Sequence, residues 1–105
     1  MKVIYSDLKN KRVFISGGGS GIGATIVEHF CEQKSEVYFI DIDLKSSKKL
    51  IKKIKKKGYR VPKFIECNIL DVKKLQNIIK DIISKKGPIH CLINSAANDI
   101  FNNIL

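Results

Sequence analysis

Five glycines lie between positions 17 and 23, directly after a β-branched apolar run and directly before a run with helical periodicity. The first N–H groups of a helix have no partner within the helix and carry a partial positive charge, so they favour a bound phosphate. Glycine makes such a turn tight and lets a ligand approach the backbone. The segment therefore predicts a diphosphate-binding turn.

The spacing of these glycines fits two registers. One is the generic G-x-G-x-x-A form, from Gly19 to Ala24. The other is a wider turn that begins at Gly17, directly after the strand, and continues through Gly21 and Gly23 into the helix. We favour the wider turn, because the generic form leaves the first two glycines without a role.

An acid follows the turn at an informative distance. Asp41 closes the second apolar run, 18 residues after Gly23. A carboxylate at about 20 residues from the turn accepts a hydrogen bond from the adenosine ribose 2′-OH, and it repels a 2′-phosphate. Asp41 therefore favours NAD over NADP. The alternative is a strand-end Asp that caps the next helix, although Asp43 could fill that role instead.

These residues must be positioned by an alternation of strands and helices. Asp71 is a candidate N-cap for the third helix, and Gly87-Pro88 ends that helix. Such alternation implies an α/β fold with a parallel sheet and right-handed crossovers, here in one domain over residues 1–105. We expect strands at 12–16, 36–41, 62–66 and 89–94, helices at about 22–34, 44–57 and 72–86, and a further helix beginning near 99.

The charge of the chain is uneven. The net charge is +10, and eight lysines lie between positions 45 and 57. We interpret this cluster as the solvated face of a helix. A basic surface can instead attract nucleic acid or an anionic membrane. Only two arginines and no interleaved aromatic residues accompany the lysines, so nucleic acid is not the expected partner.

The cysteines, histidines and apolar runs of the sequence predict the thiol state, the metal content and the location of the protein. Three cysteines without a C-x-x-C spacing predict reduced core thiols, and two isolated histidines predict no metal site. No apolar run is long enough to span a membrane, and no signal peptide is evident. We therefore expect a cytoplasmic protein without a membrane partner.

Three segments together resemble a known family, the short-chain dehydrogenases/reductases. Residues 16–23, S-G-G-G-S-G-I-G, resemble the T-G-x-x-x-G-I-G turn of that family. Residues 67–71, C-N-I-L-D, resemble its adenine-contacting D-V segment, with Asn68 in the Asp position. Residues 92–97, L-I-N-S-A-A, resemble its N-N-A-G segment, with Ser95 for the second Asn and Ala97 for the glycine.

The resemblance implies a Rossmann-like three-layer fold, partial in this chain, with about four parallel strands in the order 3-2-1-4. It implies a dinucleotide cofactor, for which Asp41 favours NAD. Asn68 can still accept a hydrogen bond from the adenine amino group through its amide oxygen. The cofactor-binding residues that the resemblance implies are Ser16, Gly17, Ser20, Gly21, Ile22, Gly23, Asp41, Asn68, Ile69, Asn94 and Ala96.

The resemblance also implies which groups are missing. In the family a catalytic Ser, and the Tyr and Lys of a Y-x-x-x-K motif, follow the fourth strand and its loop. Two strings fit that motif by letter, Tyr5 to Lys9 and Tyr59 to Lys63. The first precedes the first strand, and Pro62 interrupts the helix that the second would need. We therefore expect no catalytic residues in this chain.

Three functions remain open from the sequence. The favoured hypothesis is the cofactor-binding N-terminal half of an NAD(P)-dependent oxidoreductase that interconverts hydroxyl and ketone groups, truncated and inactive by itself. The alternatives are a non-catalytic dinucleotide-binding or regulatory module, and a basic protein that binds nucleic acid or membrane. Because the fourth strand would have an unpaired edge, we also expect homo-oligomers through the exposed sheet edge or faces, or marginal stability.

Overall fold

The computed structural model describes residues 6–95, so the helix predicted near residue 99 lies outside the described residues. Strands and helices alternate along the chain, as the sequence predicts. The elements are η1 (Ser6–Leu8), β1 (Arg12–Ser16), α1 (Gly21–Glu32), β2 (Glu36–Asp41), α2 (Leu44–Lys56), β3 (Lys63–Glu66), α3 (Val72–Lys86) and β4 (Cys91–Asn94).

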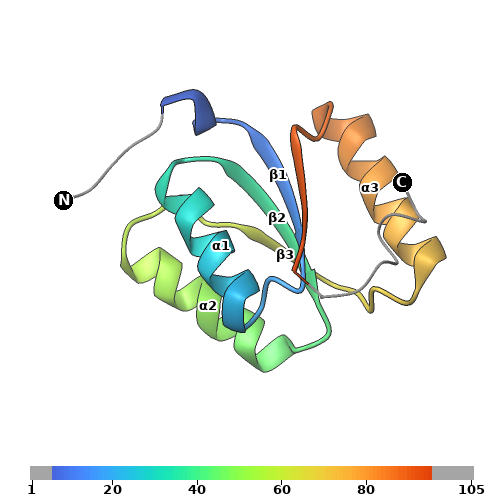
Figure 1. The fold of residues 1–105 in the computed structure, drawn as a ribbon, viewed down its shortest axis with the longest axis horizontal. Coiled ribbons are helices and arrows are strands. Elements are labelled where there is room, and N and C mark those ends of the chain that lie inside the picture. Colours follow the sequence, from blue (N-terminus) through green and yellow to red (C-terminus); the bar gives the residue numbers. More distant parts are fainter. Residues whose placement is uncertain (1–5, 96–105) are drawn as a thin grey trace.

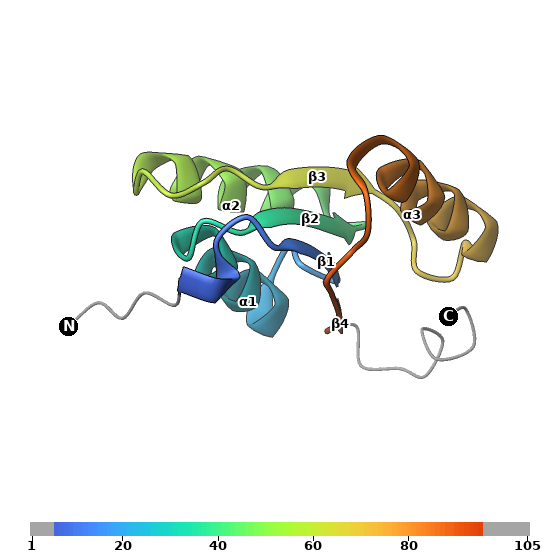
Figure 2. The ribbon, with the colours of Figure 1, turned by 90° about the horizontal axis from the view of Figure 1, so that it is seen from above.

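The four strands form one parallel sheet in the order β3-β2-β1-β4, which confirms the predicted fold class and strand order (Figure 2). The register places Ser16 of β1 between Ile40 of β2 and Asn94 of β4. From β1 the chain proceeds outward to β2 and β3, and then it returns to add β4 on the other side of β1. Open α/β sheets bind ligands at such a switch point, in the crevice beyond the carboxyl ends of the strands.

Helices cover both faces of the sheet, with α1 and α2 on one face and α3 on the other (Figure 1). Successive side chains of a strand point to opposite faces, so the apolar central strands supply two cores. The core under α1 and α2 contains Val13, Ile15, Val27, Cys31, Val37, Phe39, Leu50 and Ile54. The core under α3 contains Phe14, Tyr38, Ile40, Cys67, Leu75 and Ile82.

Two aspartates cap helices through their side chains. The Asp71 carboxylate accepts from the N–H of Lys74 at 3.2 Å, which confirms it as the N-cap of α3. The Asp43 carboxylate accepts from the N–H of Ser46 at 3.0 Å and caps α2 in the same way. Gly87 ends α3 with a φ of 104°, as the sequence predicts.

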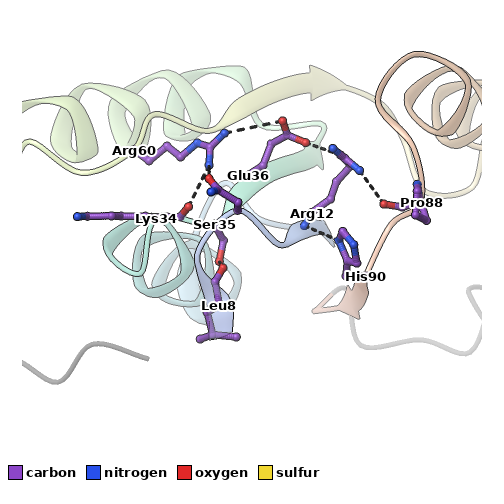
Figure 3. A network of polar contacts seen from close by, with 9 residues as sticks. Leu8, Arg12, Lys34, Ser35, Glu36, Arg60, Pro88 and His90 are labelled. Carbon is purple, nitrogen blue, oxygen red and sulfur yellow. Dashed lines mark hydrogen bonds and ion pairs between the residues drawn. The ribbon is translucent and has the colours of Figure 1, made fainter. Parts of the chain in front are cut away.

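A polar network lies at the amino ends of β1 and β2, at the opposite end of β1 from the glycines (Figure 3). Arg12 forms a short ion pair with Glu36 and donates from Nη1 to the carbonyl oxygen of Pro88 at 2.8 Å. The backbone N–H of Arg12 donates to Nδ1 of His90 at 2.8 Å. Because this N–H bonds to a side chain and not to a strand carbonyl, β4 begins at Cys91 rather than at the predicted residue 89.

Cys31 and Cys67 are buried and Cys91 is half-buried, all three as free thiols, so the prediction of core thiols is confirmed for the first two. The eight lysines between positions 45 and 57 are all exposed, as predicted for a solvated face. Of the helices within residues 6–95, none has the length and apolar character needed to cross a membrane.

Candidate cofactor site

The glycine turn connects β1 to α1 across the carboxyl end of β2. The N–H groups of Gly17 and Gly18 both donate to the carbonyl oxygen of Ile40, at 2.9 and 3.2 Å. Helix α1 begins at Gly21 with Ser20 as its N-cap residue, and the Ser20 side chain makes no capping hydrogen bond. Because the first N–H groups of a helix have no intrahelical acceptor, this end of α1 can donate to a ligand anion.

Gly23 lets α1 approach the turn. A Cβ atom at this position would overlap the carbonyl oxygen of Gly17 and would lie 2.7 Å from Oγ of Ser95. A backbone carbonyl cannot move aside as the end of a flexible side chain can. Only glycine therefore fits where the first turn of α1 meets the start of the loop. Its neighbour Ile22 is 78% exposed, so its side chain lies open to a ligand at the same end of the helix.

Asp41 at the end of β2 lies against the glycine turn. One carboxylate oxygen, Oδ2, accepts from the N–H of Gly19 at 2.9 Å, and Oδ1 accepts from the N–H of Asp43 at 2.9 Å. Helix α2 is capped by Asp43, so Asp41 is not the cap that the alternative interpretation requires. The structure thus joins two features that are 22 residues apart in the sequence.

Gly19 has no assigned role in the favoured wider turn, yet its surroundings are close. A Cβ atom there would collide with Oγ of Ser47 and would lie 3.0 Å from Oδ2 of Asp41. No sequence signal identifies this contact, because it depends on how α2 packs beneath the turn.

A cavity of about 150 Å³ adjoins the turn between the ends of β2 and β3. Asn68 lines it, and its Oδ1 already accepts from the N–H of Leu70 at 2.9 Å, which leaves one lone pair of that oxygen for a ligand. The cavity is lined by Gly17, Ile40, Asp41, Ile42, Cys67, Asn68 and Ile69, four of which are predicted site residues.

Cys67 contributes a wall of this cavity and is 2% exposed. Burial raises the pKa of its thiol, so the group is a neutral, apolar surface at neutral pH. The sequence interpretation assigned Cys67 to the core and did not place it in the site. Its position directly before Asn68, at the end of a strand, was the available signal.

The end of β4 holds the other side of the turn. Oγ of Ser16 donates to Oδ1 of Asn94 at 2.9 Å, so two predicted site residues meet across the strand pair. Oγ of Ser95 donates to the carbonyl oxygen of Ser16 in a short hydrogen bond and lies 3.1 Å from the carbonyl oxygen of Gly17. Ser95 therefore ties β4 to the glycine turn. The predicted site residue Ala96, and Ala97 after it, lie outside the described residues.

The Y-x-x-x-K string from Tyr59 to Lys63 does not form a helical pair. Tyr59 lies in the connection after α2, and Lys63 is the first residue of β3. The other string begins at Tyr5, outside the described residues.

Parallel strands in the order 3-2-1-4, helices on both faces and a glycine turn at the switch point define a Rossmann-like α/β protein. A family model described as short chain dehydrogenase matches residues 11–104, and the chain belongs to this family.

Individual relatives agree with this assignment. The chain is 36% identical over 95 residues to "Probable galactose dehydrogenase" of Rhizobium meliloti, an alignment that covers 90% of this chain. The chain spans only 37% of the length of that relative. It matches the N-terminal part of its relatives.

Solved structures agree at the level of the fold. Thermoplasma acidophilum aldohexose dehydrogenase, in its ligand-free form, matches with a TM-score of 0.69 at 27% identity, over 87% of this chain and 31% of that chain. A Haemophilus influenza protein solved with bound NAD matches with a TM-score of 0.68 at 21% identity, over 81% of this chain and 30% of that one.

Proposed function

We propose that this chain is the NAD-binding part of a short-chain oxidoreductase, and that the groups for proton transfer come from residues outside it. One observation carries the proposal. The Asp41 carboxylate lies at the carboxyl end of β2 and is bonded to Gly19, beside the uncapped first turn of α1. In an adenosine diphosphate, the ribose hydroxyls suit a carboxylate acceptor and the phosphates suit a helix N-terminus, and here these two protein groups lie side by side.

The residues of the site fit each part of the cofactor. The first N–H groups of α1 would hold the diphosphate, and the confinement of Gly23 keeps that end of α1 against the turn. Asp41 would accept from the ribose hydroxyls. The cavity beside Asn68 and Ile69 would take the adenine ring between apolar walls. When bound, the nicotinamide supplies the group that accepts or donates a hydride.

Support for NAD over NADP comes from charge. A 2′-phosphate on the ribose would bring two negative charges close to the Asp41 carboxylate, and such repulsion is strong in a partly buried site. Gly19 and Ser20, which complete the turn beside Asp41, carry no charge themselves. Lys49 and Lys53 line a hollow with these two residues, so their charges offset part of this repulsion.

Calorimetric titration of the 105-residue chain with NAD and with NADP tests the proposal. We expect NAD to bind and NADP to bind more weakly. Asp41→Ala should raise the dissociation constant for NAD by about tenfold, since it removes a charge-assisted hydrogen bond. The same substitution should reduce the preference for NAD over NADP. Asp81→Ala is the matched control, because Asp81 lies on α3 and forms an exposed ion pair with Lys85. Equal NAD affinity of wild type and Asp41→Ala would refute the assignment.

We further propose that the isolated chain self-associates through β4. Within residues 6–95, β4 pairs with β1 alone, so its other edge offers unbonded backbone groups to a second strand. Sedimentation velocity over a range of concentrations should detect a dimer or a larger species. A stable monomer at every concentration would contradict this proposal.

A further inference from the structure

Ser47 carries a buried hydroxyl without a partner. It lies in the first turn of α2, its backbone N–H bonds to the carbonyl oxygen of Asp43, and its side chain is fully buried. Among the side chains of residues 6–95, its Oγ is the buried oxygen or nitrogen that has no hydrogen-bond partner. A buried polar group in this state is costly, so its presence calls for a physical explanation.

The surroundings of this hydroxyl point to the cofactor site. The position of a Cβ atom at Gly19 would touch Oγ of Ser47 and would lie 3.0 Å from Oδ2 of Asp41. The hydroxyl and the carboxylate therefore border the same small space beneath the glycine turn. Oδ2 of Asp41 accepts from the N–H of Gly19 at 2.9 Å, and the Ser47 hydroxyl makes no hydrogen bond.

We propose that Ser47 is a positioning residue for the adenosine ribose, and that it acts through Asp41. When the ribose hydroxyls engage the outer side of the carboxylate, the Ser47 hydroxyl donates to its inner side. A carboxylate has about four acceptor positions, so it can accept from the turn, from the ribose and from Ser47 together. The inference rests on the proposed function, because it needs a ribose at Asp41.

This role predicts opposite effects on stability and on binding. Ser47→Ala removes a buried oxygen that has no hydrogen-bond partner in the structure, so the unfolding temperature measured without NAD should stay the same or rise. The same substitution removes a donor to Asp41 in the complex, so the dissociation constant for NAD should rise by about five- to tenfold. A purely structural role would lower both stability and affinity.

A double-mutant cycle with Asp41→Ala tests whether Ser47 acts through the carboxylate. Ser47→Ala should raise the dissociation constant for NAD in the wild-type background and leave it unchanged in the Asp41→Ala background. NAD binding in the Asp41→Ala background is expected to be weak, so the titrations are followed by NMR chemical shifts, which can measure millimolar dissociation constants. An equal loss in both backgrounds would overturn the proposal.

Two further variants complete the experiment. Ser84→Ala is the control, because Ser84 is exposed on α3, and it should change neither the unfolding temperature nor the NAD affinity. Ser47→Cys keeps a side chain of similar shape with a weaker donor, so its dissociation constant should lie between those of wild type and Ser47→Ala. If both Ser47 variants bind NAD as tightly as wild type while binding still depends on Asp41, the role of Ser47 is refuted and the proposed function stands. Failure of the wild-type chain to bind NAD would overturn the proposed function and this inference with it.

Discussion

Replacing Gly23 with alanine tests how closely α1 packs against the glycine turn. In a helix interior, alanine normally stabilises a protein by about 1 kcal/mol relative to glycine. At this position the new methyl group would overlap the carbonyl oxygen of Gly17 and lie 2.7 Å from Oγ of Ser95. The structure therefore predicts the reverse sign.

The magnitude follows from the two opposing contributions. Overpacking of a closely packed interior costs about 1–3 kcal/mol, and the upper part of that range applies because a backbone carbonyl blocks the methyl group. After the gain of about 1 kcal/mol in helix propensity, we expect Gly23→Ala to lower the free energy of unfolding by about 1–2 kcal/mol. Relief of the clash must move α1 away from the turn, so NAD affinity should fall more than stability alone suggests.

Urea unfolding followed by circular dichroism, together with NAD titration, measures both effects. Thr25→Ala is the control, because Thr25 is exposed on the same helix and its replacement should change stability by less than about 0.5 kcal/mol. A Gly23→Ala variant that is as stable as wild type, or more stable, would refute the close approach of α1 to the turn.

Three shorter predictions concern other parts of the chain. Burial raises the pKa of the Cys31 thiol to about 12. At pH 8 a disulfide reagent should therefore label half-buried Cys91 first and should label Cys31 only when the chain unfolds. Equal labelling rates for the two thiols would contradict the burial of Cys31. Hydrogen bonds from Ser46 lower the pKa of Asp43 in the folded chain. The ionised Asp43 carboxylate therefore stabilises the folded state above the ordinary carboxyl pKa, and this contribution is lost as the pH falls through the lowered pKa of the folded chain. Asp43→Asn should therefore flatten the acid side of the curve of unfolding temperature against pH, and an unchanged curve would exclude this role. Glu36→Gln breaks the ion pair between Arg12 and Glu36 at the amino ends of β1 and β2, and it should lower the free energy of unfolding by about 1–2 kcal/mol. NAD affinity should not change, because this ion pair lies at the opposite end of the strands from the glycine turn. A variant that keeps full stability but loses NAD affinity would contradict this prediction.

Local sequence patterns were sufficient for the elements and for much of the site. The alternation of apolar runs predicted four strands and three helices, because periods of 2 and 3.6 residues reflect which faces of each element are buried. Asp71 and Gly87 marked the ends of α3 correctly, since capping involves only residues that are neighbours along the chain. Spacing alone also singled out the glycine turn and Asp41, which the structure brings together at the carboxyl end of β2.

The start of β4 could not be placed from the sequence. The pattern predicted a strand from residue 89, and the structure begins it at Cys91, where Arg12 has turned its N–H toward His90. That contact joins residues 78 positions apart, and no local periodicity records it. Strand ends depend on which partner groups meet across the sheet.

The α/β class, the glycine turn and the acid at the end of the second strand follow from residue types and their spacing. Packing of the folded chain is what directs Asp41 to Gly19 and Asp43 to the cap of α2, although the two acids are only two positions apart. The structure alone also showed that a Cβ at Gly19 would overlap the Ser47 hydroxyl, and that this buried hydroxyl has no hydrogen-bond partner. The physical reason is that clearance and hydrogen-bond satisfaction depend on the distances between segments, which packing sets and local spacing does not encode.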